Sequence, residues 1–497
     1  MQYTNPVLSG FYPDPSVCAA NGKYYMVCSS FQYFPGVPLF ESDNLVNWKQ
    51  IGHVLTRPSQ VMLDKINSSG GVFAPTIRYH AGRFYMVTTN DTTHQNFYVY
   101  TDDIYGEWSD PIYVDQGGID PSLYFEEDGE ATGNFKTYFM SNGTDDEGKP
   151  GVIQCEIDIA TGMKKTKSIS IWNGSGGRYL ESPHLYKIGN YYYLMAAEGG
   201  TEYGHMITYA RGDSVWGPFL GYSKNPVLTY RNKAPNIVQG IGHGDLICDR
   251  NGEWHILSLG FRQMHMWMTY HNLGREVFLT PVAFHEDGWF TAGNGTTEDT
   301  YELAGDFRQD TIFGKTISFA GTDWQKEWVY LRKPKPECYR IEDGRLILAG
   351  TEITLNDTDS PTFFAVRQRE FEFSLECMLE ITGGEAGITA YMCEDEHYEV
   401  GVQKDADGYW GFLRLNIGGI HHIQNRIPLD TPKAKLQIQA DHFNYNFRIN
   451  DIALGSGGVK YLSSEVSGGF TGVVIGCYAV DRECMSEARF TDYTCKY

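Results

Sequence analysis

Short runs of strand-forming residues, separated by glycine turns, recur along the first 290 residues of the chain. The first copy starts at Asp14, turns at Gly22 and continues into residues 23–27, which are mostly aromatic or β-branched. Such runs on either side of a turn residue are typical of a β-hairpin. The pattern therefore predicts a strand, a tight turn and a second strand.

Four similar units follow, starting at Ala74, Asp120, Glu181 and His243. Counted from Asp14, the starts are separated by 60, 46, 61 and 62 residues. The second strand of these units is expected at residues 83–87, 136–140, 190–194 and 253–257. Repeats of this length can each form a four-stranded blade, so we predict a five-bladed β-propeller over residues 1–305.

The starts of the units hold the candidate chemistry. The proline after Asp14 biases this residue toward an extended backbone, which predicts that its carboxylate lies at the beginning of a strand. Matching positions of all blades lie on one ring, so Asp14, Asp120, Glu181 and His243 are expected at one mouth of the propeller channel. Each acid alone fits an ordinary strand-end residue. Three carboxylates together are costly unless a cation or a reaction uses them.

The pattern changes after a polar, turn-rich stretch at residues 294–299, and we place a domain boundary near residue 305. Shorter alternating segments follow from Phe307 onward. Candidate strands lie at residues 371–377, 398–404, 410–415 and 433–439. Several short strands at this spacing predict a C-terminal β-sandwich over residues 306–497, and hence an all-β fold class.

Size and charge narrow the function. A chain of 497 residues exceeds one ordinary core, which agrees with two domains. Its 62 acidic and 40 basic residues give a net charge of −22, which opposes binding to nucleic acid or anionic membranes. No apolar stretch approaches the roughly 18 residues of a membrane span. The 34 tyrosines suit strands and offer flat surfaces for sugar rings.

The ten cysteines show no paired C-x-x-C spacing and sit singly in apolar runs, as Cys28, Cys155 and Cys377 do. We expect reduced core thiols. Met1 is followed almost directly by the first motif, which leaves no room for a secretory signal. The expected location is therefore the cytoplasm.

A set of motifs occurs in a fixed order along nearly the whole chain. The motifs are residues 5–8 with 14–16, 29–31 with 34–38, 70–75, 118–122, 181–184, 197–200 and 273–276. Together they resemble glycoside hydrolase family 43, specifically its β-xylosidase and α-L-arabinofuranosidase members. The resemblance implies a propeller followed by a sandwich of the concanavalin-like or jelly-roll type.

The resemblance also implies a role for each acid. Glu181 is the expected general acid, Asp14 the general base that activates water, and Asp120 the residue that orients the acid and raises its pKa. Cleaving a glycoside needs one protonated and one ionised carboxyl, and a nearby negative charge keeps a proton on Glu181. Because the family inverts configuration, we expect the Glu181 and Asp14 carboxyls to lie ~6.5–9.5 Å apart, whereas ~5 Å would indicate retention.

Five further residues are expected to bind substrate. Phe31 and Phe73 match aromatic positions that line the terminal sugar subsite, with core packing as the alternative. Arg275 matches an arginine that contacts sugar hydroxyls, with a surface ion pair as the alternative. His243 either hydrogen-bonds substrate or ligates an axial cation such as calcium, although calcium prefers oxygen; no other cofactor is expected. Phe470 resembles a loop by which the sandwich closes the pocket.

The expected function is an exo-acting, inverting hydrolase that releases terminal xylose or arabinose from xylo-oligosaccharides or arabinosylated fragments. An endo-acting arabinanase or xylanase is the alternative within the enzyme class. A sugar-binding propeller without activity is the other alternative, and the presence of all three acids argues against it. Phosphate-loop, dinucleotide and G-x-S-x-G motifs are absent from the sequence. Relatives often associate, so a homo-oligomer is one alternative, but the sequence identifies neither the oligomeric state, nor an interface, nor the preferred pentose.

Overall fold

The computed structural model describes residues 1–127, 135–320, 326–483 and 485–497. Nearly all of its regular structure is β, and α1 (Ser464–Ser467) is the one α-helix in these ranges. The all-β prediction is confirmed. Within the same ranges, the structure contains no helix with the length and apolar character needed to cross a membrane.

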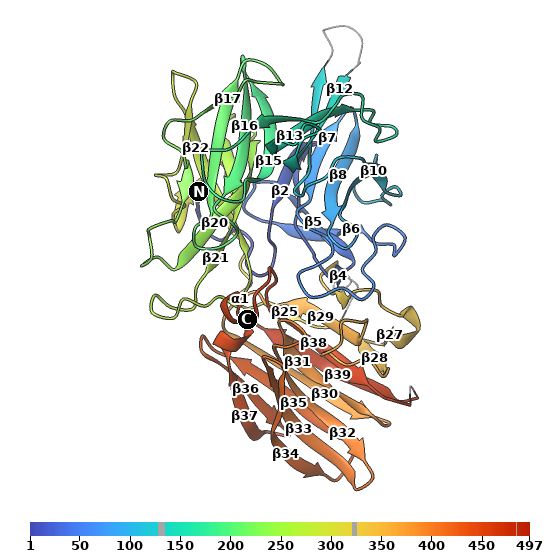
Figure 1. The fold of residues 1–497 in the computed structure, drawn as a ribbon. Coiled ribbons are helices and arrows are strands. Elements are labelled where there is room, and N and C mark those ends of the chain that lie inside the picture. The colour runs from blue at the N-terminus through green and yellow to red at the C-terminus, as the bar shows by residue number, and fades with distance from the viewer. Residues whose placement is uncertain (128–134, 321–325, 484) are drawn as a thin grey trace.

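Five antiparallel sheets, each built from strands close in sequence, occupy the first part of the chain (Figure 1). They consist of β2 (Ser16–Ala20), β3 (Lys23–Val27), β5 (Gly36–Ser42) and β6 (Lys49–Leu55); β7 (Thr76–His80), β8 (Arg83–Asn90), β9 (Gln95–Thr101) and β10 (Ile112–Val114); β11 (Ser122–Glu127), β12 (Phe135–Thr144), β13 (Pro150–Ile157) and β14 (Ile169–Trp172); β15 (Glu181–Ile188), β16 (Tyr191–Glu198), β17 (Met206–Gly212), β18 (Leu220–Gly221) and β19 (Leu228–Thr229); and β20 (Val238–Cys248), β21 (Trp254–Arg262), β22 (Glu276–Phe284) and β23 (Phe290–Ala292). The predicted second strands of all five units overlap β3, β8, β12, β16 and β21.

The first strands of the five sheets form a closed ring. β2 contacts β7, β7 contacts β11, β11 contacts β15, β15 contacts β20, and β20 contacts β2. Two ends of this region are also joined, because β1 (Gln2–Thr4) pairs with β24 (Thr300–Glu302). The beginnings of the first strands therefore lie around a common centre.

Polar bonds connect neighbouring first strands. Ser16 Oγ donates to Asp245 Oδ2 at 2.6 Å, and Arg78 pairs with the same carboxylate at 2.7 Å. Thr76 Oγ1 donates to the carbonyl of Pro121 at 2.8 Å, and Ser122 Oγ donates to the carbonyl of Pro183. Because these groups are buried and paired, they fix how the sheets sit against one another.

The backbone at the strand starts corrects two expectations. Asp14 lies before β2 as predicted, but its φ is +56°, in the left-handed region and not extended. Asp120, Ser182 and His243 share this feature, with φ of +54°, +55° and +42°. Aspartate tolerates this conformation better than most residues. Ser182, not Glu181, is thus the structural equivalent of Asp14, and a register shift after Glu181 accounts for the difference of one residue.

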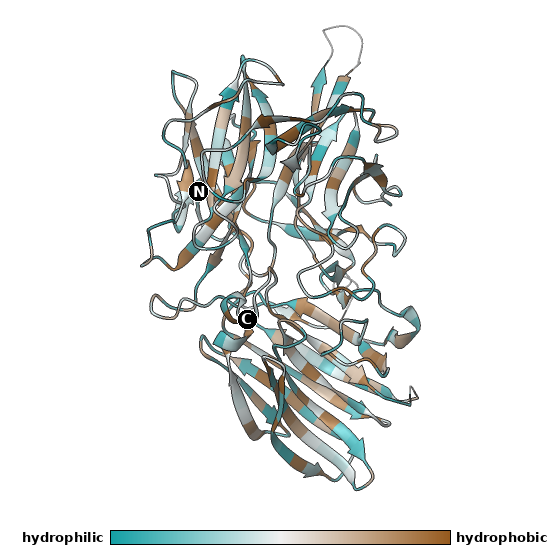
Figure 2. Ribbon diagram, viewed as in Figure 1, coloured by the Kyte–Doolittle hydropathy of each residue, from teal (hydrophilic) through white to brown (hydrophobic). Residues whose placement is uncertain are grey.

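The C-terminal region is a sandwich of two antiparallel sheets (Figure 1). One contains β25 (Thr316–Ile317), β27 (Tyr339–Glu342), β28 (Arg345–Ala349), β39 (Glu487–Lys496), β30 (Phe373–Ile381), β35 (Lys433–Ala440), β36 (Asn444–Ile449) and β37 (Ile452–Gly458); the other contains β29 (Thr362–Arg367), β38 (Val474–Val480), β31 (Glu385–Tyr391), β32 (His397–Asp405), β33 (Gly408–Ile417) and β34 (Ile420–Leu429). Every second residue of β30 is buried, and apolar positions alternate with polar ones in Figure 2. The four strands predicted here overlap β30, β32, β33 and β35.

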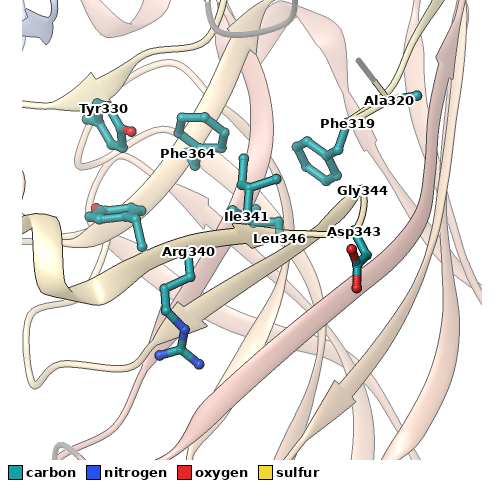
Figure 3. A pocket seen from close by; sticks show the side chains of 10 residues that line it. Phe319, Ala320, Tyr330, Arg340, Ile341, Asp343, Gly344, Leu346 and Phe364 are labelled. Atoms are coloured by element: carbon teal, nitrogen blue, oxygen red, sulfur yellow. The ribbon is translucent and has the colours of Figure 1, made fainter. Parts of the chain in front are cut away.

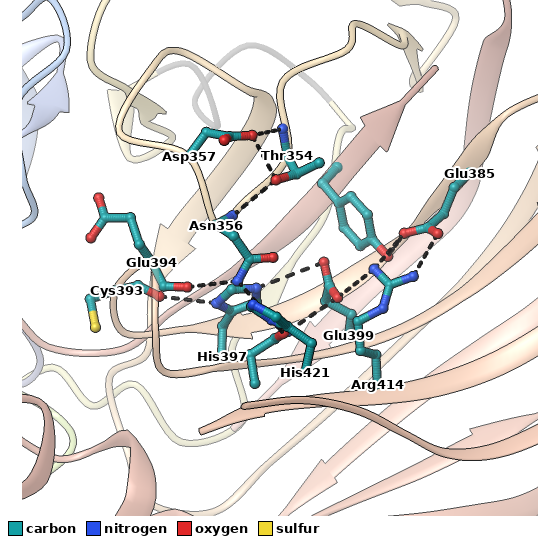
Figure 4. Close-up of polar contacts among 12 residues, drawn as sticks. Thr354, Asn356, Asp357, Glu385, Cys393, Glu394, His397, Glu399, Arg414 and His421 are labelled. Atoms are coloured by element: carbon teal, nitrogen blue, oxygen red, sulfur yellow. Dashed lines mark hydrogen bonds and ion pairs between the residues drawn. The ribbon is translucent and has the colours of Figure 1, made fainter. Parts of the chain in front are cut away.

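A partly buried ion network ties strands β31, β32 and β33 of the second sheet together (Figure 4). Arg414 on β33 pairs with Glu385 on β31 at 2.7 Å and with Glu399 on β32 at 2.9 Å. Tyr478 on β38 donates to Glu385 as well. Each carboxylate has a charged partner, so the network serves the sandwich itself.

The two regions meet on the side where the first strands begin. β4 (Tyr33–Phe34) pairs with β26 (Tyr330–Leu331), and Glu465 of α1 accepts a hydrogen bond from the backbone N–H of His271 at 2.9 Å. β23 ends at Ala292 and β25 begins at Thr316. The predicted boundary near residue 305 falls between these strands and stays a prediction.

Candidate active site

One cavity of about 740 Å³ opens between the strand starts and the sandwich. The structure places all eight predicted site residues on its wall: Asp14, Asp120, Glu181, Phe31, Phe73, His243, Arg275 and Phe470. Ala74, the start of the second unit, lines it too. Residues from the starts of all five units and from the sandwich thus meet in one space.

A second cavity, of about 720 Å³, lies within the sandwich (Figure 3). Aromatic rings, including Tyr330 and Phe364, form much of its wall. Its charged lining residues are Arg340 and Asp343, one of each sign. Only the first of these two cavities brings several carboxylates together, so the chemistry is sought there.

Asp14 is buried among groups that favour its ionised form. Its Oδ2 accepts a hydrogen bond from Ser29 Oγ at 2.5 Å, and its Oδ1 lies 2.9 Å from an Arg275 nitrogen and 3.6 Å from Nδ1 of His243. Burial raises the pKa of Asp14, but the Arg275 charge, His243 and the Ser29 hydrogen bond together lower it below its ordinary value. Asp14 is therefore a carboxylate at neutral pH.

Glu181 is in the opposite situation. Burial, and then the negative charge of Asp14, raise the pKa of Glu181 to about 7, while Arg275 opposes the shift. Glu181 therefore holds its proton up to neutral pH and has the properties of an acid catalyst.

Asp120 lies beside the backbone of the Glu181 segment. Its Oδ2 accepts a hydrogen bond from the N–H of Ser182 at 3.1 Å, and it lies 3.8 Å from Nδ1 of His243. Burial, and then the charges of Glu181 and Asp14, raise the pKa of Asp120. The negative charge that acts most on Glu181 is thus that of Asp14, whereas Asp120 holds the chain next to the acid.

Three phenylalanines form an apolar part of the cavity wall. Ring centroids are 5.6 Å apart for Phe31 and Phe73, 6.0 Å for Phe31 and Phe470, and 6.4 Å for Phe73 and Phe470. Arg275 lies 5.7 Å from the rings of Phe31 and Phe470, and donates to the Phe470 carbonyl at 3.1 Å. One arginine therefore connects the ionised Asp14 to the sandwich loop.

Several wall residues were not predicted. They are Arg178, Tyr179, Thr201, Glu202, Tyr203, His205, Phe261, His271 and Glu465. Thr201 accepts a hydrogen bond from Arg275 at 2.9 Å. Because it directly follows the motif at residues 197–200, the sequence offered a reason to include it among the site residues. Glu465 reaches the wall only because α1 of the sandwich packs there, and no local pattern indicates this.

Buried Glu198, within that motif, supports the segment leading to the acid. It accepts hydrogen bonds from the N–H groups of Ser175 and Gly177, at 2.7 and 2.5 Å, and from Thr208 Oγ1 at 2.7 Å. These bonds hold residues 175–177 just before Glu181. Glu198 thereby helps to fix the backbone that leads into Glu181 and the cavity wall.

The arrangement suits hydrolysis of a glycosidic bond. Such a reaction needs a carboxyl that gives a proton to the leaving oxygen and a carboxylate that activates water. Glu181 and Asp14 meet these requirements, and both face a cavity with an apolar wall on which a sugar ring can pack.

Known proteins resemble this chain over nearly its full length. The Non-reducing end alpha-L-arabinofuranosidase BoGH43B of Bacteroides ovatus is 35% identical and covers 96% of this chain and 91% of its own. The Beta-xylosidase of Bacillus subtilis is 30% identical and covers 97% of both chains. The crystal structure of a xylan beta-1,4-xylosidase from Bacillus halodurans has a TM-score of 0.90, with 29% identity, and covers 99% of this chain and 100% of that one.

Family comparisons assign both regions. Residues 316–496 match the family described as Beta xylosidase C-terminal Concanavalin A-like domain, which agrees with the observed sandwich. Residues 3–290 match the family described as Glycosyl hydrolases family 43. Since this second match covers more than half of the chain, the protein is a glycoside hydrolase that belongs to family 43.

Proposed function

We propose that this enzyme removes single xylose or arabinose units from the nonreducing ends of xylo-oligosaccharides or arabinosylated fragments, with inversion of configuration. The observation that carries the proposal is the pairing of an ionised Asp14 with a Glu181 whose pKa is about 7, in one cavity. The names of the relatives, an arabinofuranosidase and a β-xylosidase, support both pentoses as substrates.

In the proposed reaction, Glu181 gives its proton to the glycosidic oxygen as the bond to the anomeric carbon breaks. Asp14 takes a proton from a water molecule, whose oxygen attacks the anomeric carbon from the opposite face. Asp120 holds the backbone beside Glu181 and so orients the acid. The separation of ~6.5–9.5 Å between the Glu181 and Asp14 carboxyls, which leaves room for this water, stays a prediction.

Closure of the cavity by the sandwich supports exo action. The N–H of Phe470 donates to Ser69 Oγ at 2.8 Å, and its carbonyl accepts from Arg275, so the loop is held on both sides. In this proposal Phe31 and Phe73 pack against the terminal sugar, and Arg275 binds its hydroxyls. An endo-acting enzyme needs a groove open at both ends.

We also propose that the five sheets are the blades of a five-bladed propeller, which the closed ring of first strands supports. No cofactor is needed for the proposed reaction. Calcium takes about six to eight oxygen ligands. Around His243 lie two carboxylates, one of them already paired with Arg275, which favours a substrate contact for this histidine over an axial calcium site.

Location and assembly remain proposals. Nine of the ten cysteines lie in the described residues, and among them Cys28, Cys155 and Cys377 are buried free thiols, which supports the cytoplasm. A homo-oligomer is proposed without an assigned interface.

The pKa values predict the pH dependence of the reaction. Glu181 must be protonated, so kcat/KM on an aryl β-D-xylopyranoside should fall above about pH 7, approaching tenfold per pH unit. Asp14 must be ionised. Because its pKa lies below the ordinary aspartate value of 3.8, Asp14 stays ionised throughout the mildly acidic range. We therefore expect a plateau on the acidic side of pH 7. A profile that rises through pH 7 and falls only above pH 9 would contradict the roles of both residues.

Product analysis tests the function directly. From xylotetraose, an exo-acting enzyme should release xylose and xylotriose from the first minutes, and proton NMR should show the α-anomer of xylose first. Early xylobiose as the main product would indicate endo action, and β-xylose first would indicate retention. Comparing kcat/KM on aryl β-D-xylopyranoside and aryl α-L-arabinofuranoside identifies the preferred pentose.

A further inference from the structure

The turn between β20 and β21, with the start of β21, brings together side chains of types that can ligate a metal, away from the active site. Asp249, Glu253 and His255 each place one ligand atom within 4.8 Å of the others. Across the described ranges, no other group of three or more histidine, cysteine, aspartate or glutamate side chains comes this close. Asp249 lies six residues beyond His243, which is roughly 20 Å along a strand at about 3.3 Å per residue.

His255 is buried without the hydrogen bonds that a buried imidazole normally makes. Its side chain is 2% exposed, and neither ring nitrogen has a hydrogen-bond partner among the residues that the structure describes. Nε2 points toward Oδ2 of Asp249 but lies 3.6 Å away, beyond hydrogen-bond distance. Buried polar atoms without a partner are rare, and an ion or water that the coordinates do not include is one explanation.

The repeat shows that the fold does not require these three residues. His255 lies three residues after the hairpin glycine, Gly252. At the same distance from their glycines, the first, second and fourth units carry Tyr25, Tyr85 and Tyr192. At the position of Asp249, three residues before the glycine, these units have Ala19, Tyr79 and Tyr186. At the position of Glu253, directly after the glycine, they have Lys23, Arg83 and Asn190. The ligand set of the fifth unit is therefore absent from the three other units with a hairpin of comparable length.

The free atoms of the turn face one another. Oδ1 of Asp249 accepts the N–H groups of Asn251 and Glu253, both at 2.8 Å, and so shapes the turn. Oδ2 of Asp249 receives only a 3.3 Å contact from the Asn251 side chain and faces His255. Glu253 is exposed, so its carboxylate can move toward the other two ligands.

The donor set fits zinc better than calcium. Zinc binds imidazole nitrogen and carboxylate oxygen at about 2.0–2.2 Å, usually with four ligands in a tetrahedron, which places ligand atoms about 3.4 Å apart. The 3.6 Å between His255 and Asp249 is close to this value. Calcium instead prefers about six to eight oxygens and is rarely bound by imidazole.

We propose that Asp249, Glu253 and His255 bind one zinc ion, with water as the fourth ligand. The ion joins the end of β20 to the start of β21 and satisfies the buried His255. It stabilises the fifth sheet and takes no part in hydrolysis, because it is far from the acids.

Zinc binding to the full chain tests the proposal. Protein freed of metal with a chelator is titrated with zinc chloride at pH 7 by calorimetry, beside Glu253→Gln, His255→Tyr and the exposed control Glu107→Gln. Tyrosine is the residue of three other units at this position, and Glu253 is exposed, so both variants should fold. We expect the parent and Glu107→Gln to bind one zinc ion with equal affinity. In Glu253→Gln and His255→Tyr the zinc affinity should be at least tenfold weaker.

Thermal unfolding gives a second measurement. Zinc at about 100 times the dissociation constant of the parent should raise the Tm of the parent and of Glu107→Gln by about 3 °C or more, and should raise the Tm of the two site variants by at most about half as much. Unchanged kcat/KM on an aryl xyloside confirms that the variants are folded. Equal zinc affinity in all four proteins, or a parent that binds no zinc, would overturn the proposal. A Tm rise with calcium that Glu253→Gln abolishes, without one from zinc, would overturn the choice of metal.

Discussion

Replacing Asp14 by asparagine should lower kcat/KM on aryl β-D-xylopyranosides by about 10³–10⁴-fold, because the attacking water loses its base. Asparagine has nearly the same shape: its single side-chain oxygen can keep the hydrogen bond from Arg275, and its NH2 group, in the place of Oδ2, can donate to Ser29 Oγ. Binding of the sugar should therefore change much less than turnover. Steady-state kinetics with the aryl substrate, and xylose inhibition constants for the same protein, separate the two effects.

The same substitution should also alter the acid. The charge of Asp14 contributes to the raised pKa of Glu181, so its removal should move the alkaline limb of the remaining activity below pH 7. Asp115→Asn removes an exposed carboxylate and serves as the matched control, with unchanged rate and pH profile. A loss of less than tenfold in Asp14→Asn would show that another group activates the water.

Sequence reasoning could predict which residues meet, because the repeat places each strand start on one ring. The position of Glu181 within its unit was assigned from the acids, whereas the proline that follows Asp14, Asp120 and Ser182 already aligns Ser182 with Asp14. The structure agrees with the prolines, since a register shift between Glu181 and His184 puts Ser182 in line with Asp14. The acid still reaches the cavity from one residue earlier.

The left-handed backbone of Asp14 was missed for a different reason. The proline that follows favours an extended conformation locally, but the Ser29 and Arg275 bonds hold the carboxylate in place and the chain adapts around it. The sequence alone does not predict that Glu465 and His271 belong to the site, because they line the cavity only once the two domains have packed together. Local patterns encode the strands, whereas the outer wall depends on tertiary contacts.

Replacing Glu181 by glutamine should produce a loss of activity that depends on the leaving group. An oligosaccharide leaves as an alkoxide unless it receives a proton, so kcat/KM on xylobiose should fall by about 10³–10⁴-fold. A dinitrophenyl xyloside has an acidic leaving group that departs unprotonated, so its rate should fall by less than about tenfold. With the dinitrophenyl xyloside, the pH profile of Glu181→Gln should no longer fall near pH 7, because the Glu181 carboxyl that causes this fall is gone.

This dependence separates the two carboxyls whose pKa is raised. Asp120 shares that property with Glu181, so a raised pKa alone does not identify the acid. Because Asp120 contacts the Ser182 backbone and acts through position, Asp120→Asn should slow xylobiose and the dinitrophenyl xyloside by similar factors. Glu286→Gln, on an exposed side chain, should change neither. If Asp120→Asn shows the leaving-group dependence and Glu181→Gln does not, the proton comes from Asp120 and the assignment of the acid is wrong.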